Sequence, residues 1–466
     1  MTETKGVQNL SNSITQPFDL SQFGDKPSKD SVAAELDISH AQIEADSSKA
    51  KMDEALKIWE EGRALDFMLS SCKSEHVGDI FLMEAMILSY AATRVKNCEG
   101  IHISISGNAG KGKSHVVSVV KKHLPDNVTY SGRLSDRALF YHQRPPKSVI
   151  IMDDQELSED MQEAIKNSTT EWDIPYRYET VKNQVAETLT LPVRAVYWIV
   201  KVNLNGDEQI LDRQLVFHVD ESPEQTARIH EHIKNRYLPP YDNIQTRDED
   251  EEHNKDVSKF IWQNIPDGLN VFIPYSEDIN ITGNLDLRNV QLFYALIQAI
   301  TILHATKRKS VDNGVYASIE DFKEAQRIIS PLLMNKGGSQ TLKLSAPAAT
   351  LLEYLRTKES GTYTFSDLQE GTGFTQKKLT EAINGRGDSK SGGLEGCPGV
   401  EIINLNDKVD YPTLDNGEPI RNRSKSRKAV EWNREQFEKS GAISGDITMS
   451  EKQYRYWLEK EKDFFS

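Results

Sequence analysis

The segment from Ile101 to His115, IHISISGNAGKGKSH, holds the residues whose types and spacing point most directly to chemistry. It fits the pattern G-x-x-x-x-G-K-[ST] in full. Glycines let the backbone bend tightly, so that its N–H groups converge on phosphate oxygens. The lysine of such a loop reaches the β- and γ-phosphates, and the serine hydroxyl binds Mg²⁺. We therefore expect ATP and Mg²⁺ here, with contacts from Gly107, Asn108, Ala109, Gly110, Lys111, Gly112, Lys113, Ser114 and His115.

A pair of carboxylates, Asp153 and Asp154, follows the apolar run SVIIM about 40 residues after the loop. An Asp-Asp pair is common in turns, but at the end of an apolar strand beyond a phosphate loop it predicts a second nucleotide-binding signature. Asp153 would hold Mg²⁺ through water. Asp154 would orient or deprotonate the attacking water, with Glu156 as a less favoured candidate.

The elements around the loop have the order that a phosphate site needs. Ile101, Ile103 and Ile105 alternate in a predicted strand, and HVVSVVKKHL predicts an amphipathic helix after the loop. The amino end of that helix would place its positive dipole under the anion. A chance glycine loop would not have this context, so the sequence predicts an α/β fold with a parallel sheet.

Two polar residues beside later strands are candidates for sensing the nucleotide. The predicted strand 195–202 ends at Asn203, which is either a γ-phosphate sensor or an ordinary turn residue. Arg213 follows Asp212 and precedes the apolar strand LVFHV. It is either a finger that reaches a neighbouring subunit's nucleotide or a surface arginine paired with Asp212.

The segment after this core predicts a linker and a helical lid. Residues 247–256, RDEDEEHNKD, read as an acidic, solvated linker. Arg288 heads a long predicted helix, and Ser318 begins another with the S-x-x-D cap pattern. We expect this lid to fold over the nucleotide, with Arg288 as a second phosphate sensor.

Beyond a linker at 337–340, three short helices are predicted at 348–358, 366–371 and 375–384. The last two flank Gly371-Thr372-Gly373 with helix-turn-helix spacing, which puts Lys377 and Lys378 on the first turn of a recognition helix. Residues 385–399 would form a wing. The basic run that follows, 421–428, is either a phosphate-contacting segment or solvated surface.

Composition limits the other possibilities. The 466 residues carry a net charge of −15, so a nucleic-acid site must be a local patch. Three separated cysteines without a C-x-x-C pair argue against a zinc site or a disulfide framework and fit a reducing cytoplasm. We expect neither a signal peptide nor a membrane span.

The order of these elements resembles the AAA+ ATPases over about residues 75–405. The predicted hairpin around Lys182-Asn183-Gln184 resembles the one that minichromosome maintenance and superfamily III helicases push into a DNA channel. The lid resembles that of minichromosome maintenance proteins. LSDRALFY, DRQLVFHVDESPEQTARIHE and PYSEDI resemble the ATPase module joined to zinc-finger, Toprim-type primases of mobile elements.

This resemblance implies further assignments. Arg213 would be the trans-acting finger, Arg288 the second sensor and Asn203 the first sensor, with Lys201 as the alternative. Lys182 at the hairpin tip would touch DNA. The primase zinc finger and Toprim domain are absent from this sequence, so primer synthesis is not supported. Asp154 stands where many AAA+ proteins have Glu, and a shorter carboxylate could slow hydrolysis or shift the base role.

The sequence as a whole predicts five segments: a disordered tail (1–50), a nucleotide-binding core with N-terminal helices (51–246), an acidic linker with a helical lid (247–335), a winged helix (341–410) and a basic and polar C-terminal tail (411–466). The function expected is an ATP-hydrolysing DNA motor, such as a replicative helicase of a mobile element or plasmid. It would act as a homo-oligomeric ring, with single-stranded DNA in its pore and duplex at the winged helix, beside a primase or initiator. The alternatives are a helicase loader or replication initiator, and an ATP-dependent winged-helix regulator.

Overall fold

The computed structural model describes residues 29–132, 136–142, 144–182, 185–201, 208–237, 242–282, 285–334, 344–385, 393–404, 428–439 and 446–465. The chain divides into two compact units, residues 1–50 and 51–466. Helix α1 (Lys29–Glu60) begins inside the segment that we expected to be a disordered tail. Residues 29–50 contain five alanines, the residue with the highest helix propensity, which favours a helix without a clear apolar stripe.

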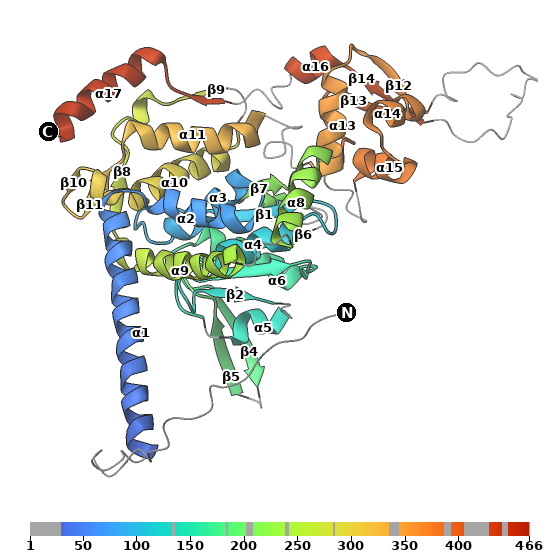
Figure 1. Cartoon of the computed structure of the whole chain (residues 1–466). Coiled ribbons are helices and arrows are strands. Elements are labelled where there is room, and N and C mark those ends of the chain that lie inside the picture. Colours follow the sequence, from blue (N-terminus) through green and yellow to red (C-terminus); the bar gives the residue numbers. More distant parts are fainter. Residues whose placement is uncertain are drawn as a thin grey trace, which may run out of the picture. The chain divides into compact units, whose positions relative to one another are not determined.

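The central sheet of the described residues has five parallel strands in the order β2-β3-β6-β1-β7 (Figure 1). They are β1 (His102–Ser106), β2 (Thr129–Ser131), β3 (Val149–Asp153), β6 (Val196–Lys201) and β7 (Gln214–His218). Strand β6 therefore lies between β1, which leads into the phosphate loop, and β3, which ends at Asp153. All these strands end at one edge of the sheet, so residues far apart in sequence meet there.

Helices cover both faces of this sheet, and the side chains of β3 show how the faces divide. Val149 and Ile151 join the main core, which includes α2 (Ala64–Glu75), α3 (Ile80–Ala92) and α4 (Lys113–Lys121). Ile150 and Met152 point to the other face and pack with α5 (Asp136–Tyr141) and α6 (Glu159–Thr170). This two-residue alternation of fully apolar strands is what a parallel sheet buried on both sides requires.

The predicted hairpin between α6 and β6 is present. Strands β4 (Arg177–Lys182) and β5 (Val185–Thr190) pair antiparallel and extend away from the central sheet (Figure 1). Val181 and Val185, on either side of the tip, are 71% and 66% exposed. The hairpin therefore offers an accessible apolar surface near its tip.

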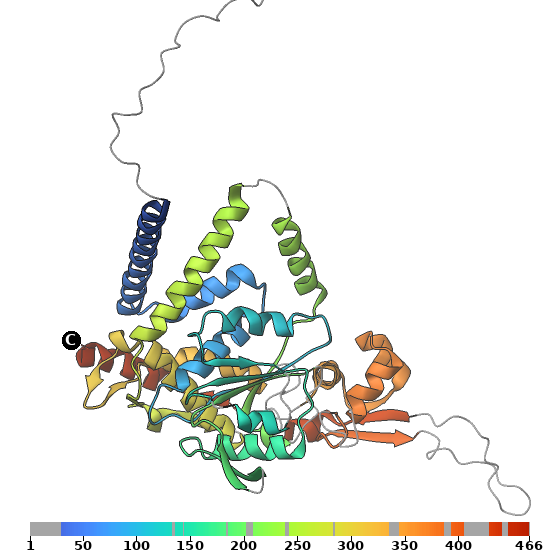
Figure 2. The same ribbon diagram turned by 90° about the horizontal axis from the view of Figure 1, so that it is seen from below.

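The acidic run at 247–256 is not a linker but part of α9 (Asp242–Asn264). Figure 2 shows α9 and α8 (Pro223–Arg236) as two inclined helices. The buried residues Glu251, Lys255, Ser258 and Trp262 recur at helical spacing on one face of α9. That face is half polar, so the charge composition did not distinguish a helix from a linker. On this face Lys255 pairs with the buried Glu75 at 3.3 Å.

The lid contains α10 (Leu287–Leu303), α11 (Ile319–Met334), a small sheet of β8 (Asn270–Phe272), β10 (Ser310–Val311) and β11 (Gly314–Tyr316), and strand β9 (Asn280–Thr282). The cap pattern at Ser318 is confirmed: its N–H donates to Asp321 Oδ2 at 2.9 Å, and its Oγ accepts the Glu320 N–H at 3.2 Å. The chain returns to the lid at its end, through β15 (Asp446–Thr448) and α17 (Glu451–Phe465). Residues 446–465 are therefore structured, whereas we expected a polar tail.

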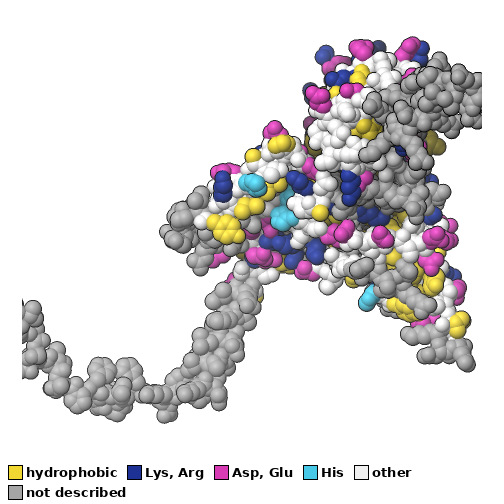
Figure 3. Space-filling model, turned by 90° about the vertical axis from the view of Figure 1, so that its right-hand side faces the viewer, with side chains coloured by type: hydrophobic (Ala, Val, Ile, Leu, Met, Phe, Trp, Pro, Cys, Tyr) yellow, Lys and Arg dark blue, Asp and Glu magenta, His cyan; other side chains and the backbone are white. Residues whose placement is uncertain are grey.

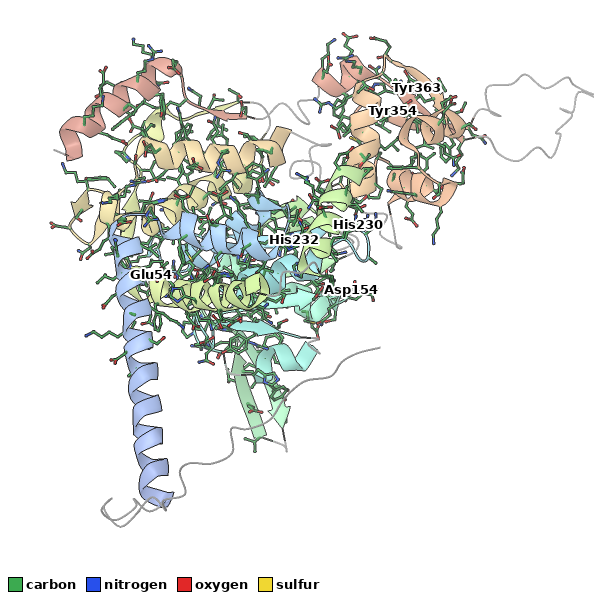
Figure 4. The ribbon with its side chains drawn as sticks, viewed as in Figure 1. Glu54, Asp154, His230, His232, Tyr354 and Tyr363 are labelled. Carbon is green, nitrogen blue, oxygen red and sulfur yellow. The ribbon has the colours of Figure 1, made fainter. Side chains whose placement is uncertain are left out.

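Residues 344–439, which we call the C-terminal module, have a separate core. Their elements are α13 (Ala346–Arg356), β12 (Gly361–Thr364), α14 (Phe365–Thr372), α15 (Gln376–Asn384), β13 (Val400–Asn404), β14 (Lys428–Trp432) and α16 (Arg434–Lys439). The strands form an antiparallel sheet in the order β12-β14-β13. Tyr354 packs directly over Gly371, where a Cβ would lie 2.0 Å from the tyrosine Cζ and force the ring to move (Tyr354 is labelled in Figure 4).

Within the described ranges, no helix has the length and hydropathy of a membrane span.

Candidate nucleotide-binding site

The phosphate loop runs from Gly107 to Ser114 between β1 and α4. Gly110 and Gly112 have φ angles of 76° and 88°, which glycine adopts without the cost that a Cβ brings. At Gly107 a Cβ would lie 2.4 Å from Val219 Cγ2, so strand β7's end packs directly on the loop. These positions explain why the local sequence needs glycine.

Lys113 folds back over the loop. Its Nζ donates to the carbonyl oxygens of Gly107 and Asn108, at 2.7 and 2.8 Å, and the residue is 8% exposed. Burial lowers the pKa of Lys113, and the carboxylates of Glu221, Asp154 and Asp153 act against that shift. The ammonium group is thus held in the loop, close to three carboxylates from two other strand ends.

Asp153 and Asp154 stand where the sequence placed them, at the carboxyl end of β3. Asp153 is opposite Val200 of β6, and the Asp154 N–H donates to the Val200 carbonyl at 2.9 Å. Asp154 has a φ of 48°, a left-handed conformation that is uncommon for a residue with a Cβ. The backbone therefore turns sharply between the two carboxylates, both of which are exposed (Asp154 is labelled in Figure 4).

The oxygens at this edge suit Mg²⁺, which prefers carboxylate, hydroxyl, water and phosphate ligands. Ser114 is exposed on the first turn of α4, and Asp153 is exposed one strand beyond β6. Ser114 and Asp153 are the residues that would hold the metal beside a triphosphate.

Of the two sensor candidates, only Lys201 belongs to the described residues. Asn203 lies outside the described residues. Lys201 is the last residue of β6 and is paired in register with Ser106, directly before the phosphate loop. Burial lowers the pKa of Lys201, with Glu156 acting against it. Lys201 therefore stands between the loop and the Asp153 carboxylate.

Glu221 contacts the phosphate loop and was not identified from the sequence. Its Oε1 accepts the Asn108 backbone N–H at 2.5 Å, and its Oε2 accepts from the Asn108 side-chain amide. A signal was present: Asp220 and Glu221 follow the apolar strand LVFHV, just as Asp153 and Asp154 follow SVIIM. Since β7 is parallel to β1, an acidic pair at its end also reaches the phosphate edge.

From the sequence we expected His115 to contact the nucleotide, but we did not identify its neighbours His76 and Asp79. His115 Nδ1 lies 2.9 Å from His76 Nδ1, and His76 Nε2 lies 3.0 Å from Asp79 Oδ2. His76 Cε1 would be 3.6 Å from a Cβ at Gly112. The two histidines are 39 positions apart, so no local pattern could have linked them.

Arg213 and Arg288 lie together, but not at the phosphate loop of their own chain. Both line a cavity of about 530 Å³ with Gly100 and His102, at the amino end of β1. Arg288 Nη1 is 3.9 Å from Asp212 Oδ2, and Arg213 Nε donates to Thr170 Oγ1 at 3.2 Å. Strand β1 separates this cavity from the loop by roughly 13 Å or more. The expected fold of the lid over its own nucleotide, with Arg288 at the phosphates, is therefore not formed.

The wall of this cavity is built from buried rings. His102 and Trp172 meet edge to face with centroids 5.6 Å apart, and His102 Nδ1 accepts the Tyr197 N–H at 3.2 Å. Burial, with a smaller effect of Arg213, lowers the pKa of His102 to about 3. His102 is therefore neutral at neutral pH, and the basic side chains that line the cavity are those of Lys96, Arg213 and Arg288.

The predicted DNA contacts are only partly described. Lys182 ends β4, but its side chain lies outside the described residues, as do Asn183, Gln184 and the basic run through residue 427. Lys377 is exposed on the first turn of α15, whereas Lys378 Nζ sits 4.5 Å from the Phe374 ring centre. On the face shown in Figure 3, the coloured basic and acidic side chains are interspersed.

The parallel α/β sheet, the phosphate loop and the carboxylates at its edge are those of a P-loop nucleotide-binding domain. Comparisons agree with this class. The family model described as the MTBMA_p00010 P-loop domain matches residues 47–268. An uncharacterized protein, MTBMA_p00010 of Methanothermobacter marburgensis, is 22% identical over 338 residues, which cover 67% of this chain and 41% of that relative. The chain thus corresponds to less than half of the relative's length.

Proposed function

We propose that this protein is an ATP-hydrolysing DNA motor of the AAA+ type that works as a homo-oligomeric ring. The observation that carries the proposal is the cavity shared by Arg213 and Arg288. Both guanidinium groups are at the amino edge of the sheet, while the phosphate loop is at the carboxyl edge. Two arginines that lie away from the phosphate loop of their own subunit are explained if a second copy brings its nucleotide to them.

In this arrangement one subunit binds ATP and its neighbour completes the site. Lys113 and the N–H groups of the loop would hold the triphosphate, and Ser114 and Asp153 would hold Mg²⁺, which neutralises charge on the phosphates. Asp154 would position and deprotonate water, with Lys201 or Asn203 sensing the γ-phosphate. The neighbour's Arg213 and Arg288 would stabilise the charge that develops on the transferred phosphoryl group.

Two further features support DNA as the substrate. The β4–β5 hairpin projects from the core and would carry Lys182 into the pore of a ring. The C-terminal module has the element order of a winged helix, with Lys377 exposed on the helix that would enter the major groove. A mobile-element or plasmid replication helicase, served by a primase or initiator, would use both.

Mixing two inactive variants tests the shared site. Arg213→Ala and Lys113→Ala should each fail to hydrolyse ATP alone. When they are mixed, ATP hydrolysis should be partly restored, because some interfaces join an intact loop to an intact arginine. Mixing Arg213→Ala with Arg288→Ala discriminates further. If both arginines act in trans, every interface lacks one and no activity returns. Recovery in that second mixture would mean that Arg288 serves its own subunit's nucleotide. A monomeric mass with ATP and no rescue in either mixture would contradict the ring.

The exposed Lys377 on α15 also suits two alternatives, a helicase loader or initiator that uses ATP as an assembly switch, and an ATP-dependent regulator. Turnover decides among them. Fast hydrolysis stimulated by single-stranded DNA, with unwinding of a forked substrate, favours the motor. Slow hydrolysis with sequence-specific duplex binding favours the regulator, and ATP-dependent assembly without unwinding favours the loader.

A further inference from the structure

The last described segment of the chain, residues 446–465, packs on the lid; we call it the C-terminal strap. Its strand β15 pairs antiparallel with β9, with Ile447 opposite Ile281. Ile447 is fully buried in the main core, and its carbonyl accepts from Gln326 Nε2 of α11 at 2.8 Å. The strap is therefore bonded to the lid at its first residues.

The helix of the strap, α17, is bonded to the lid at two more points. Asp278 accepts from Trp457 Nε1 at 2.7 Å and from Gln453 Nε2 at 2.8 Å. Glu461 accepts the Ile319 N–H at 2.5 Å and the Ser318 hydroxyl at 3.0 Å, so it caps the first turn of α11. A carboxylate at that position satisfies a free N–H group and complements the helix dipole. These contacts give α11 part of its amino-terminal cap from a residue 142 positions away.

The strap changes how the C-terminal module is connected. The chain leaves the lid at the end of α11, forms the module and re-enters the lid at β15. The module is thus an insertion in the lid, connected along the chain by residues 335–343 and 440–445, which lie outside the described residues. The second tether leads to β9, and β9 is followed within five positions by the start of α10, where Arg288 lies.

We infer that the strap stabilises the lid and couples the C-terminal module to it. In this coupling, DNA bound by the module changes the rate of ATP hydrolysis by displacing β9 and the start of α10, which carries Arg288. The coupling rests on the proposed function, because it needs a module that binds DNA and an arginine that acts on phosphate. The stabilisation of the lid by the strap does not depend on the proposed function.

The first experiment tests the strap in the full chain. Glu461→Ala removes the cap on α11, and Glu459→Ala changes an exposed residue of the same helix as a matched control. Hydrogen exchange at Ile319 and Glu320 should be about fivefold faster in Glu461→Ala, as for loss of a helix cap, and unchanged in the control. Equal exchange in the two variants would overturn the strap's contribution.

The second experiment tests the coupling. A protease site placed within residues 440–445 allows the second tether to be cut after purification, and ATP turnover is measured without DNA and with a forked DNA. Cutting should leave DNA-free turnover within about twofold and remove most of the DNA stimulation. Asp278→Ala should lose stimulation in the same way, with Glu277→Ala as its exposed control. Undiminished stimulation after cutting and in Asp278→Ala would overturn the coupling.

Failure of the coupling can be distinguished from failure of the proposed motor function. If the uncut wild-type chain hydrolyses ATP but does not respond to any DNA, both the motor function and the coupling are wrong. The hydrogen-exchange result still shows whether the strap stabilises the lid. If the wild-type chain responds to DNA and the cut chain responds equally, the motor function stands and only the coupling fails.

Discussion

Lys113 and Glu221 hold opposite sides of the same peptide unit in the phosphate loop. Lys113 Nζ donates to the Gly107 carbonyl at 2.7 Å, while Glu221 Oε1 accepts the N–H of that same peptide group, which is the Asn108 N–H, at 2.5 Å. The loop is thus fixed by a cation from α4 and by an anion from the end of β7. This arrangement holds the loop in shape but also places a carboxylate near the position of the triphosphate.

Replacing Lys113 should abolish hydrolysis, because Lys113→Ala removes the ammonium group that both braces the loop and faces the transferred phosphate. Asp153→Asn should have the same effect through loss of the metal ligand. We expect turnover to fall by at least about 100-fold in each, the scale of losing one charge-stabilising group in a catalytic site. Lys121→Ala, at the other end of α4, is the control. Near wild-type turnover in Lys113→Ala would remove the basis for the nucleotide site.

Neutralising Glu221 should strengthen ATP binding. Glu221→Gln keeps an oxygen that can accept the Asn108 N–H but removes a negative charge beside the phosphates. In water, two unit charges about 4 Å apart interact by about 1 kcal/mol, which corresponds to about fivefold in Kd. Calorimetric titration with a non-hydrolysable ATP analogue measures this, with Glu224→Gln on the first turn of α8 as the control. Weaker binding in Glu221→Gln would mean that its charge mainly orders the loop.

The buried His102 should make the fold sensitive to acid. Its pKa is lowered to about 3 from an ordinary 6.5, so between these pH values the unfolded chain binds a proton that the folded chain does not. Stability contributed by neutral His102 is therefore complete above about pH 6.5 and falls as the pH decreases toward 3. Between pH 7.5 and pH 5 the loss should be about 2 kcal/mol.

The variant His102→Asn tests this effect, because asparagine can accept the Tyr197 N–H without titrating. Its free energy of unfolding, from denaturant titrations, should fall less than that of the wild type over the same pH range. His142→Asn, at an exposed histidine, should behave like the wild type. Identical pH dependence in all three proteins would mean that His102 does not control acid stability.

The hairpin tip should separate a motor from a switch. Under the motor proposal, Lys182→Ala should spare DNA-free hydrolysis and abolish both single-strand stimulation and unwinding. Each lost phosphate contact should also reduce the log–log salt slope of single-strand binding by roughly 0.7. Arg177→Ala, at the base of the same hairpin, controls for the loss of a positive charge. Forked DNA unwound at the wild-type rate by Lys182→Ala would mean that the hairpin is not the grip.

Local patterns in the sequence were sufficient for the parts of the site that are contiguous in the chain. The phosphate loop from Gly107 to Ser114, the Asp153-Asp154 pair, the β4–β5 hairpin and the Ser318 cap each depend on residues within a few positions of one another. Glycine geometry, strand alternation and capping act over that range, so they can be recognised before any tertiary contact is known.

The tertiary structure decided what distant segments do together. It brought Glu221 to Asn108 and His76 to His115, put Arg288 beside Arg213 instead of over its own phosphate loop, and made residues 446–465 part of the lid. It also turned the acidic run 247–256 into a helix, since its polar side chains pair with Glu75 on α2 and with Lys51 and Glu54 on α1. The order of parallel strands and the packing of the lid fix these contacts. Both depend on burial shared by the whole domain, which no single stretch of sequence encodes.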